Sequence, residues 1–244
     1  MIEAQQLRKT FGDVVAVDDV SFQAGDGLIT GLLGPNGAGK TTCLRMIYGL
    51  LEPGRGSVTI DGIDPHRDPR SARARLGVLP DSKGIYPRLT ARENIAYYGK
   101  IHGLRGDALN ARVETLVHEL GLNRVADRRA EGFSQGERMK VAIARALVHD
   151  PSNVLLDEPT NGLDIMSTRA MRELIASLRD QGRCVVFSSH VMQEVSALCD
   201  RIVVISRGRV AAAGTPDELR QTTGKDSLED AFVALIGSEE GLEG

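Results

Sequence analysis

The chain has 244 residues, of which 41% are hydrophobic and 26% are charged, so it can bury a sizeable core and is not expected to be disordered. Its 30 Lys and Arg residues against 33 Asp and Glu give a net charge of −3, which excludes a broadly basic surface and argues against nucleic acid as a partner. The longest apolar run, Ala231–Ile236, is far shorter than the ~20 residues of a membrane-spanning helix. Three cysteines without metal-ligand spacing favour a reducing cytosol.

Apolar runs that end at glycine or acidic residues alternate along the chain with stretches at helical spacing. In chain order, we expect strand Leu28–Leu33, helix Lys40–Leu50, strands Val58–Ile60 and Leu76–Leu79, helices Arg92–Gly103, Asp107–Leu120 and Ser134–Val148, strand Val154–Asp157, helix Ser167–Arg179, strand Cys184–Ser188, helix Val191–Leu198 and strand Ile202–Ile205. An amphipathic helix around 228–236 is expected to dock on the core. The alternation predicts an α/β fold, with helices on both faces of a mostly parallel sheet.

A glycine-rich loop lies between the first expected strand and the first expected helix. It reads Gly34-Pro35-Asn36-Gly37-Ala38-Gly39-Lys40-Thr41, followed by Thr42, and matches G-x-x-x-x-G-K-[ST]. Glycines let backbone N–H groups approach phosphate oxygens closely, and the helix N-terminus adds its positive dipole end. We expect this loop to bind ATP, with Lys40 bridging the β- and γ-phosphates and the Thr41 hydroxyl ligating Mg²⁺.

Two carboxylates end the expected strand Val154–Asp157. Because successive side chains of a strand point to opposite sides, Asp157 and Glu158 are expected to have different tasks. We expect Asp157 to hold Mg²⁺ through water and Glu158 to polarise the attacking water. A solvated strand end is the ordinary alternative, and the phosphate-binding loop upstream argues against it.

With these motifs in view, nearly the whole chain resembles the ATP-binding subunits of ABC transporters. The signature segment of that family, L-S-G-G-Q, reads Phe133-Ser134-Gln135-Gly136-Glu137 here. The resemblance implies that Ser134 and Gly136 cap the γ-phosphate held by another copy in a head-to-tail dimer, because a helix N-terminus presents N–H groups to an anion. Gln135 and Glu137 depart from the pattern, and Ser134 with Glu137 also matches an S-x-x-E capping box.

The resemblance assigns roles to further positions. His190 matches the switch histidine that contacts the γ-phosphate, and Phe11 matches the aromatic residue that stacks on adenine. Asn161-Gly162-Leu163-Asp164 resembles the D-loop of the dimer interface, which places Asp164 near the nucleotide. A structural histidine, a packed phenylalanine and a plain glycine turn are the respective alternatives.

Asp81 stands where the family places a glutamine that senses Mg²⁺ and faces the membrane partner, within Leu79-Pro80-Asp81-Ser82-Lys83-Gly84. Both side chains offer an oxygen to a hard cation, but aspartate is one methylene shorter and carries a charge. We expect Asp81 to keep the coupling role through a water molecule.

The stretch 79–90, the signature segment and 157–164 together resemble ATPases of type-2 ABC exporters, particularly the sodium-efflux branch and related drug exporters. The resemblance implies a P-loop NTPase core with an antiparallel β portion at 1–81 and 151–215, a helical lobe at 82–150 and a helical tail at 216–244. Two identical or similar copies are expected to close on two Mg²⁺·ATP and drive a separate membrane permease from the inner face of the cell membrane.

Two other functions stay open. A soluble ABC ATPase of the iron–sulfur assembly type fits a single cassette, although the exporter resemblance argues against it. A regulator with weakened catalysis is suggested by Asp81, Gln135 and Glu137, although intact Glu158 and His190 argue against that function.

Overall fold

A six-stranded sheet forms the centre of the computed structural model, which describes residues 1–82 and 84–240. In spatial order, its strands are β5 (Leu76–Leu79), β6 (Asn153–Asp157), β7 (Cys184–Ser189), β3 (Ile29–Leu33), β8 (Arg201–Ser206) and β9 (Arg209–Gly214). Neighbouring strands pair in parallel except β8 and β9, which form an antiparallel hairpin. The predicted α/β fold with a mostly parallel sheet is therefore confirmed, and β9 is an added edge strand.

A smaller antiparallel sheet lies beside the central one. Its strand order is β2 (Val14–Ala24), β1 (Ile2–Phe11) and β4 (Arg55–Ile60). The sequence did not reveal β1 and β2, because Gln6 and Asp19 adopt left-handed backbone angles (φ 50° and 62°) and the β1–β2 register shifts repeatedly. Such irregularities interrupt the strict alternation of apolar and polar residues that marks a strand.

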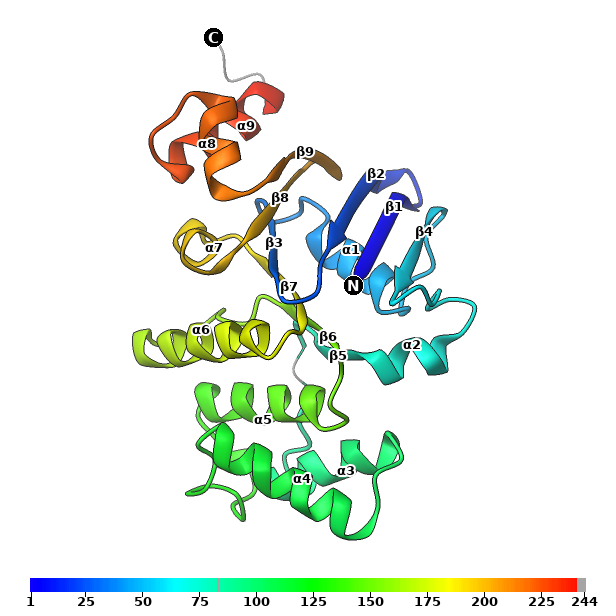
Figure 1. Cartoon of the computed structure of the whole chain (residues 1–244), viewed down its shortest axis with the longest axis vertical. Coiled ribbons are helices and arrows are strands. Elements are labelled where there is room, and N and C mark those ends of the chain that lie inside the picture. The colour runs from blue at the N-terminus through cyan, green and yellow to red at the C-terminus, as the bar shows by residue number, and fades with distance from the viewer. Residues whose placement is uncertain (83, 241–244) are drawn as a thin grey trace.

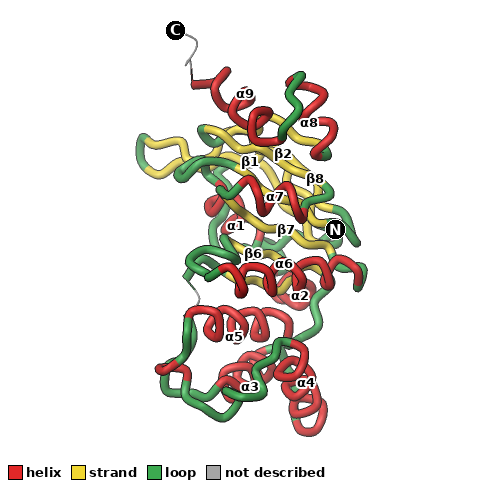
Figure 2. Tube along the Cα trace, turned by 90° about the vertical axis from the view of Figure 1, so that its left-hand side faces the viewer, coloured by secondary structure: helices red, strands yellow, loops and turns green. Residues whose placement is uncertain are grey.

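The helices lie on both faces of the central sheet and at both ends of the molecule (Figures 1 and 2). They are α1 (Lys40–Ile47), α2 (Pro69–Arg75), α3 (Ala91–Ile101), α4 (Gly106–Glu119), η1 (Ala130–Gly132), α5 (Gln135–Leu147), α6 (Ile165–Asp180), α7 (Met192–Leu198), α8 (Pro216–Thr223) and α9 (Leu228–Glu240). Figure 1 shows α3, α4 and α5, which we call the helical lobe, at one end and α8 with α9 at the other. None of the helices in residues 1–82 and 84–240 combines the length and the hydropathy required to cross a bilayer.

Local chemistry sets where several helices begin and end. Thr90, Ser134 and Thr215 each form a capping box with the glutamate three residues later, at the starts of α3, α5 and α8. Helix α1 ends at Ile47 rather than at the predicted Leu50, because Gly49 turns the chain with a left-handed φ of 71°.

Two apolar cores cover the two faces of the central sheet. On β6, Val154 and Leu156 point into the core shared with α3 to α7, whereas Leu155 points into the core shared with α1 and the smaller sheet. The alternation along this buried strand explains its continuous apolar sequence. Helix α9 adds Leu228 and Ile236 to the first core, so the predicted docking of the C-terminal helix is confirmed.

We expect Phe187→Ala to lower the free energy of unfolding by about 3–5 kcal/mol, because it removes a large side chain from a packed core. Phe187 is only 1% exposed in the middle of β7. Urea denaturation followed by circular dichroism measures the change. Val233→Ala is the control because Val233 is 63% exposed on α9. Equal losses in the two variants would contradict the assigned core.

Candidate functional site

The predicted site residues follow the carboxyl ends of three adjacent parallel strands. In the register of the sheet, Leu33 of β3 pairs with Ser189 of β7, and Asp157 of β6 pairs with Ser188 of β7. The segments that leave these strands therefore meet at one edge of the sheet. Ligands of open α/β sheets bind at this edge, outside the carboxyl ends of the strands.

The glycine loop is held closely between β2 and the β8–β9 turn. Gly39 has a left-handed φ of 104°, and a Cβ atom there would lie 2.6 Å from the carbonyl oxygen of Ala16. A Cβ atom on Gly34 would lie 2.2 Å from the carbonyl oxygen of Ile205. The N–H of Gly208 in the β8–β9 turn donates to the carbonyl oxygen of Ala38 at 2.9 Å. These contacts require glycine at two motif positions and give the loop a defined shape.

A cleft of about 450 Å³ opens above the glycine loop and the N-terminus of α1. It is lined by Ala16, Asn36, Gly37, Ala38, Gly39, Lys40, Thr41, Thr42, Asp81, Glu158, Asn161 and His190. The cleft thus unites the glycine loop with three segments far away in sequence. Its open mouth and its many polar groups suit a charged ligand rather than an apolar one.

Lys40 provides a buried cation beside the glycine loop. Its Nζ donates to the carbonyl oxygens of Gly34 at 2.7 Å and Pro35 at 3.1 Å. It also forms an ion pair with Oε1 of Glu158 at 3.7 Å. Burial lowers the pKa of the Lys40 ammonium, while the charges of Glu158 and Asp157 oppose that shift.

Asp157 lies between α1 and β7 and is held by hydroxyl groups. Its Oδ1 accepts hydrogen bonds from Ser188 Oγ at 2.6 Å and from Thr41 Oγ1 at 3.3 Å. Ser188 Oγ in turn accepts the backbone N–H of Glu158 at 3.0 Å. Ser188 therefore connects the two acidic residues and orients both.

The donor set around Thr41 and Asp157 fits a small divalent cation. Their two oxygens lie 3.3 Å apart, and Asp81 lines the same cleft. Within residues 1–82 and 84–240, no group of three or more His, Cys, Asp or Glu residues could form an all-protein metal cage. Mg²⁺ needs no such cage, because it is usually bound by one or two carboxylates together with phosphate oxygens and water.

Glu158 contacts both Lys40 and His190. Its Oε2 lies 3.0 Å from Nδ1 of His190, and its backbone has a left-handed φ of 48°. A residue other than glycine adopts this conformation only where its surroundings enforce it. The strained backbone turns the carboxylate into the cleft, within reach of a histidine and an ammonium group. A carboxylate so placed can accept a proton from a water molecule.

Six predicted residues do not line this cleft in the part of the chain that the structure describes. Two of them adjoin it: Gly34 accepts a hydrogen bond from Lys40 Nζ through its carbonyl oxygen, and Asp157 accepts one from Thr41 Oγ1. The other four lie elsewhere. Phe11 lies at the turn between β1 and β2 with its ring 51% exposed. Ser134 and Gly136 lie at the N-terminus of α5, and Asp164 caps the N-terminus of α6. Asp164 Oδ1 accepts the backbone N–H of Ser167 at 2.8 Å.

The capping box predicted at the signature segment is present. Ser134 Oγ accepts the N–H of Glu137 at 3.2 Å, and Glu137 Oε2 accepts the N–H of Ser134 at 2.7 Å. Burial acts to raise the pKa of Glu137, but these hydrogen bonds and the charge of Arg128 outweigh it and hold that pKa below its usual range. The glutamate that replaces the usual glutamine therefore stabilises the start of α5.

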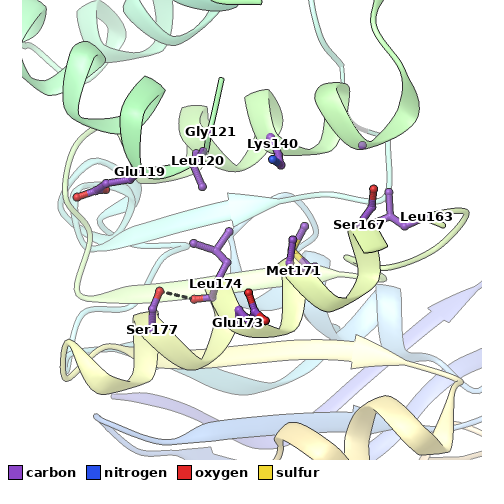
Figure 3. A pocket seen from close by; sticks show the side chains of 12 residues that line it. Glu119, Leu120, Gly121, Lys140, Leu163, Ser167, Met171, Glu173, Leu174 and Ser177 are labelled. Carbon is purple, nitrogen blue, oxygen red and sulfur yellow. Dashed lines mark hydrogen bonds between the residues drawn. The ribbon is translucent and has the colours of Figure 1, made fainter. Parts of the chain in front are cut away.

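Gln135, the other departure from the family pattern, joins the helical lobe to the segment after β6. Its Nε2 donates to the carbonyl oxygen of Asn161 at 3.2 Å. Next to it, a Cβ atom on Gly136 would lie 2.8 Å from Ser167 Oγ of α6. A second cleft of about 380 Å³ extends from this point between α5 and α6, with Leu174 and Met171 on the side of α6 and Lys140 facing them from α5 (Figure 3).

Three residues of the site were not predicted. Ala16 lines the cleft and places its backbone carbonyl oxygen against Gly39, a contact that no side-chain pattern could indicate. Asn161 directly follows the acidic segment, and its polar side chain beside Gly162 was the available signal. Ser188 is a fully buried hydroxyl in an otherwise apolar strand, which was the signal for a structural hydrogen bond.

Comparisons with known proteins identify similar chains. A family model described as "ABC transporter" matches residues 17–161. The ABC transporter ATP-binding protein NatA of Bacillus subtilis (strain 168) is 46% identical over 241 residues, which cover 97% of this chain and 98% of NatA. A solved ATP-binding subunit of an ABC transporter has a TM-score of 0.88 at 30% identity and covers 96% of this chain and 99% of its own. A dimeric ATP-binding cassette in a post-hydrolysis state, bound to ADP and phosphate, has a TM-score of 0.79 at 26% identity and covers 88% and 98% of the two chains.

Proposed function

Because this chain belongs to the ABC transporter family and is an ATPase subunit of the exporter kind, we propose that its cleft binds Mg²⁺·ATP and that Glu158 is the base of hydrolysis. The observation that carries this proposal is the position of Glu158. Its carboxylate lies in one cleft with the glycine loop, 3.7 Å from Lys40 Nζ and 3.0 Å from His190 Nδ1.

The residues of the glycine loop hold the phosphates. Residues 36–41 and the N-terminus of α1 line the cleft, where backbone N–H groups bind phosphate oxygens. When the nucleotide binds, the ammonium group of Lys40 leaves the carbonyl oxygens of the loop and contacts the β- and γ-phosphates instead. Thr41 and Asp157 hold Mg²⁺, with Asp81 acting through water, and the bound cation neutralises phosphate charge. The exposed ring of Phe11 supports a stacking role on adenine.

Glu158 and His190 act on the γ-phosphate and the attacking water. The Glu158 carboxylate accepts a proton from water as the water oxygen bonds to the γ-phosphorus, and the bond from that phosphorus to the bridging oxygen of ADP breaks, so ADP and phosphate are the products. His190 directs Nδ1 at Glu158, so its Nε2 can donate to a γ-phosphate oxygen when both ring nitrogens carry a proton. Hydrolysis thus depends on Glu158 and His190, which are far apart in the sequence and are brought into contact by the folding of the chain.

A head-to-tail dimer completes the site. Ser134 and Gly136 lie outside the cleft of their own chain, at the capped N-terminus of α5, where free N–H groups suit an anion. Ile165 and Met166, directly after Asp164, are 87% and 73% exposed, and such apolar exposure favours contact with a second chain. The dimeric cassette among the similar structures supports the formation of a dimer.

Transport requires a second polypeptide. We propose that the core (1–81 and 151–215), the helical lobe (82–150) and the tail (216–244) act together at the inner face of the cell membrane on an integral membrane permease. Lys83 and residues 241–244 of these ranges lie outside the described residues. The cargo is sodium or a drug, as the exporter resemblance of the sequence implies, and the permease selects it. NatA and the solved ATP-binding subunit, both named as ABC transporter proteins, support a transporter over an iron–sulfur assembly ATPase.

Glu158→Gln is expected to lower ATP turnover on the order of 10²–10⁴-fold, because the amide cannot accept the proton of the attacking water. ATP binding should persist, so the variant should elute as a dimer with Mg²⁺·ATP in gel filtration. Phosphate release and fluorescent-nucleotide titration measure the two effects. Turnover near the wild-type rate would remove Glu158 from the role of base and would favour another mechanism.

Asp81→Ala is expected to lower both ATP turnover and transport, because it removes an oxygen that lines the cleft near Thr41. The measurements are phosphate release and cargo flux in proteoliposomes with the permease. Asp226→Ala, at an exposed loop position, is the matched control. Wild-type rates of both processes in Asp81→Ala would contradict a coupling role.

Affinity purification of the tagged chain from gently solubilised membranes is expected to recover a polypeptide with several membrane-spanning helices. The neighbouring reading frame is the first candidate, and a strain lacking that frame is the control. Recovery of a soluble assembly protein in its place would contradict the exporter proposal and favour the soluble class of ATPase.

A further inference from the structure

Glu194, on α7, is a buried acidic residue that the proposed chemistry does not use. It is 5% exposed, although it lies in a short helix that follows the loop of His190. Its Oε2 accepts hydrogen bonds from Thr160 Oγ1 at 2.6 Å and from Ser189 Oγ at 2.9 Å. Both hydroxyl groups are themselves buried. Burying a carboxylate is costly unless it is paired or hydrogen-bonded, so this arrangement needs a physical explanation.

The two hydroxyl groups lie next to the proposed catalytic residues, one in the loop after β6 and one at the last residue of β7. Thr160 lies two residues after Glu158, in a turn where the N–H of Asn161 donates to the carbonyl oxygen of Glu158 at 3.2 Å. Ser189 directly precedes His190, and its Oγ accepts the N–H of Val191 at 3.0 Å. One carboxylate oxygen therefore joins the segment after β6 to the last residue of β7, which directly precedes His190.

Hydrogen bonds to one shared oxygen restrict how far the two loops can move apart. Glu158 and His190 are in contact at 3.0 Å, and Glu158 has a left-handed backbone that its surroundings must enforce. Hydrogen bonds to a charged acceptor are about twice as strong as neutral ones, so a carboxylate holds the loops better than an amide would. Within the described residues, Glu194 forms no ion pair that would give its charge another purpose.

We propose that Glu194 is a positioning residue for ATP hydrolysis, which holds Glu158 and His190 in register through the hydroxyl groups of Thr160 and Ser189. Glu194 is not among the described residues that line the nucleotide cleft. The inference rests on the proposed roles of Glu158 and His190. It concerns the rate of the chemical step, because Thr160 and Ser189 are not among the residues that line the nucleotide cleft.

The test compares kcat and KM for ATP across a small set of variants of the full chain. Glu194→Ala should lower kcat roughly 10–100-fold, because small misplacements of reacting groups cost up to about 10² in rate. Its KM should stay within about twofold of wild type, because the glycine loop that carries binding is untouched. Glu194→Gln, which keeps one acceptor oxygen, should have a kcat between that of wild type and that of Glu194→Ala. Glu173→Ala, an exposed glutamate of α6 that pairs with Arg169, is the matched control.

Thr160 supplies the decisive variants, which remain informative if Glu194→Ala fails to fold. Thr160→Val removes the hydroxyl group at nearly constant volume and should lower kcat. Thr160→Ser keeps the hydroxyl group and should have a kcat close to that of wild type. In the Glu194→Ala background, Thr160→Val should lower kcat no further, because its partner is absent. Equal kcat in Thr160→Val and Thr160→Ser, or a rise of KM alone, would overturn the proposal. The proposed role of Glu158 is tested separately by Glu158→Gln.

Discussion

Parallel pairing of β6, β7 and β3 places the glycine loop, the acidic pair and His190 at one edge of the sheet. The register sets Asp157 opposite Ser188 and Leu33 opposite Ser189, so the glycine loop, the acidic pair and the histidine loop leave the sheet together. A shift of one residue in β6 would exchange the faces of Asp157 and Leu156 and destroy the contact with Thr41. The two apolar cores oppose such a shift, because each accepts only one set of alternating side chains.

Buried hydroxyl groups connect the acidic residues at this edge. Ser188 joins Asp157 to the backbone of Glu158, and Thr160 with Ser189 joins Glu194 to the loops on either side. A network of buried polar groups is favourable only when its members are satisfied, and it then permits very few arrangements. The network can therefore maintain the left-handed backbone of Glu158, which a looser site would relax.

The proposed dimer explains why the signature segment lies outside the nucleotide cleft of its own chain. The N-terminus of α5 is capped within its own chain by Glu137 and is joined by Gln135 to the segment after β6. Both departures from the family pattern therefore make hydrogen bonds that support the helix end and leave Ser134 and Gly136 in place. They reinforce the local structure of the signature segment, which weakens the argument for a regulator with lost catalysis.

Gly34–Thr41, Asp157 and Glu158 could be predicted from the sequence, because a close approach of backbone to phosphate and a strand ending in acids impose local residue patterns. His190 was predicted only through the family resemblance. The alternation of strands and helices likewise predicted the mostly parallel sheet. Strands β1 and β2 were not predicted, because the irregular backbone at Gln6 and Asp19 interrupts the alternation of apolar and polar residues along them. The backbone of Ala16, the bridging role of Ser188 and the burial of Glu194 were decided only by the tertiary structure. Each depends on contacts between segments far apart in the chain. The sequence around a glutamate in a short helix does not show whether its side chain faces water or, as Glu194 does, two buried hydroxyl groups.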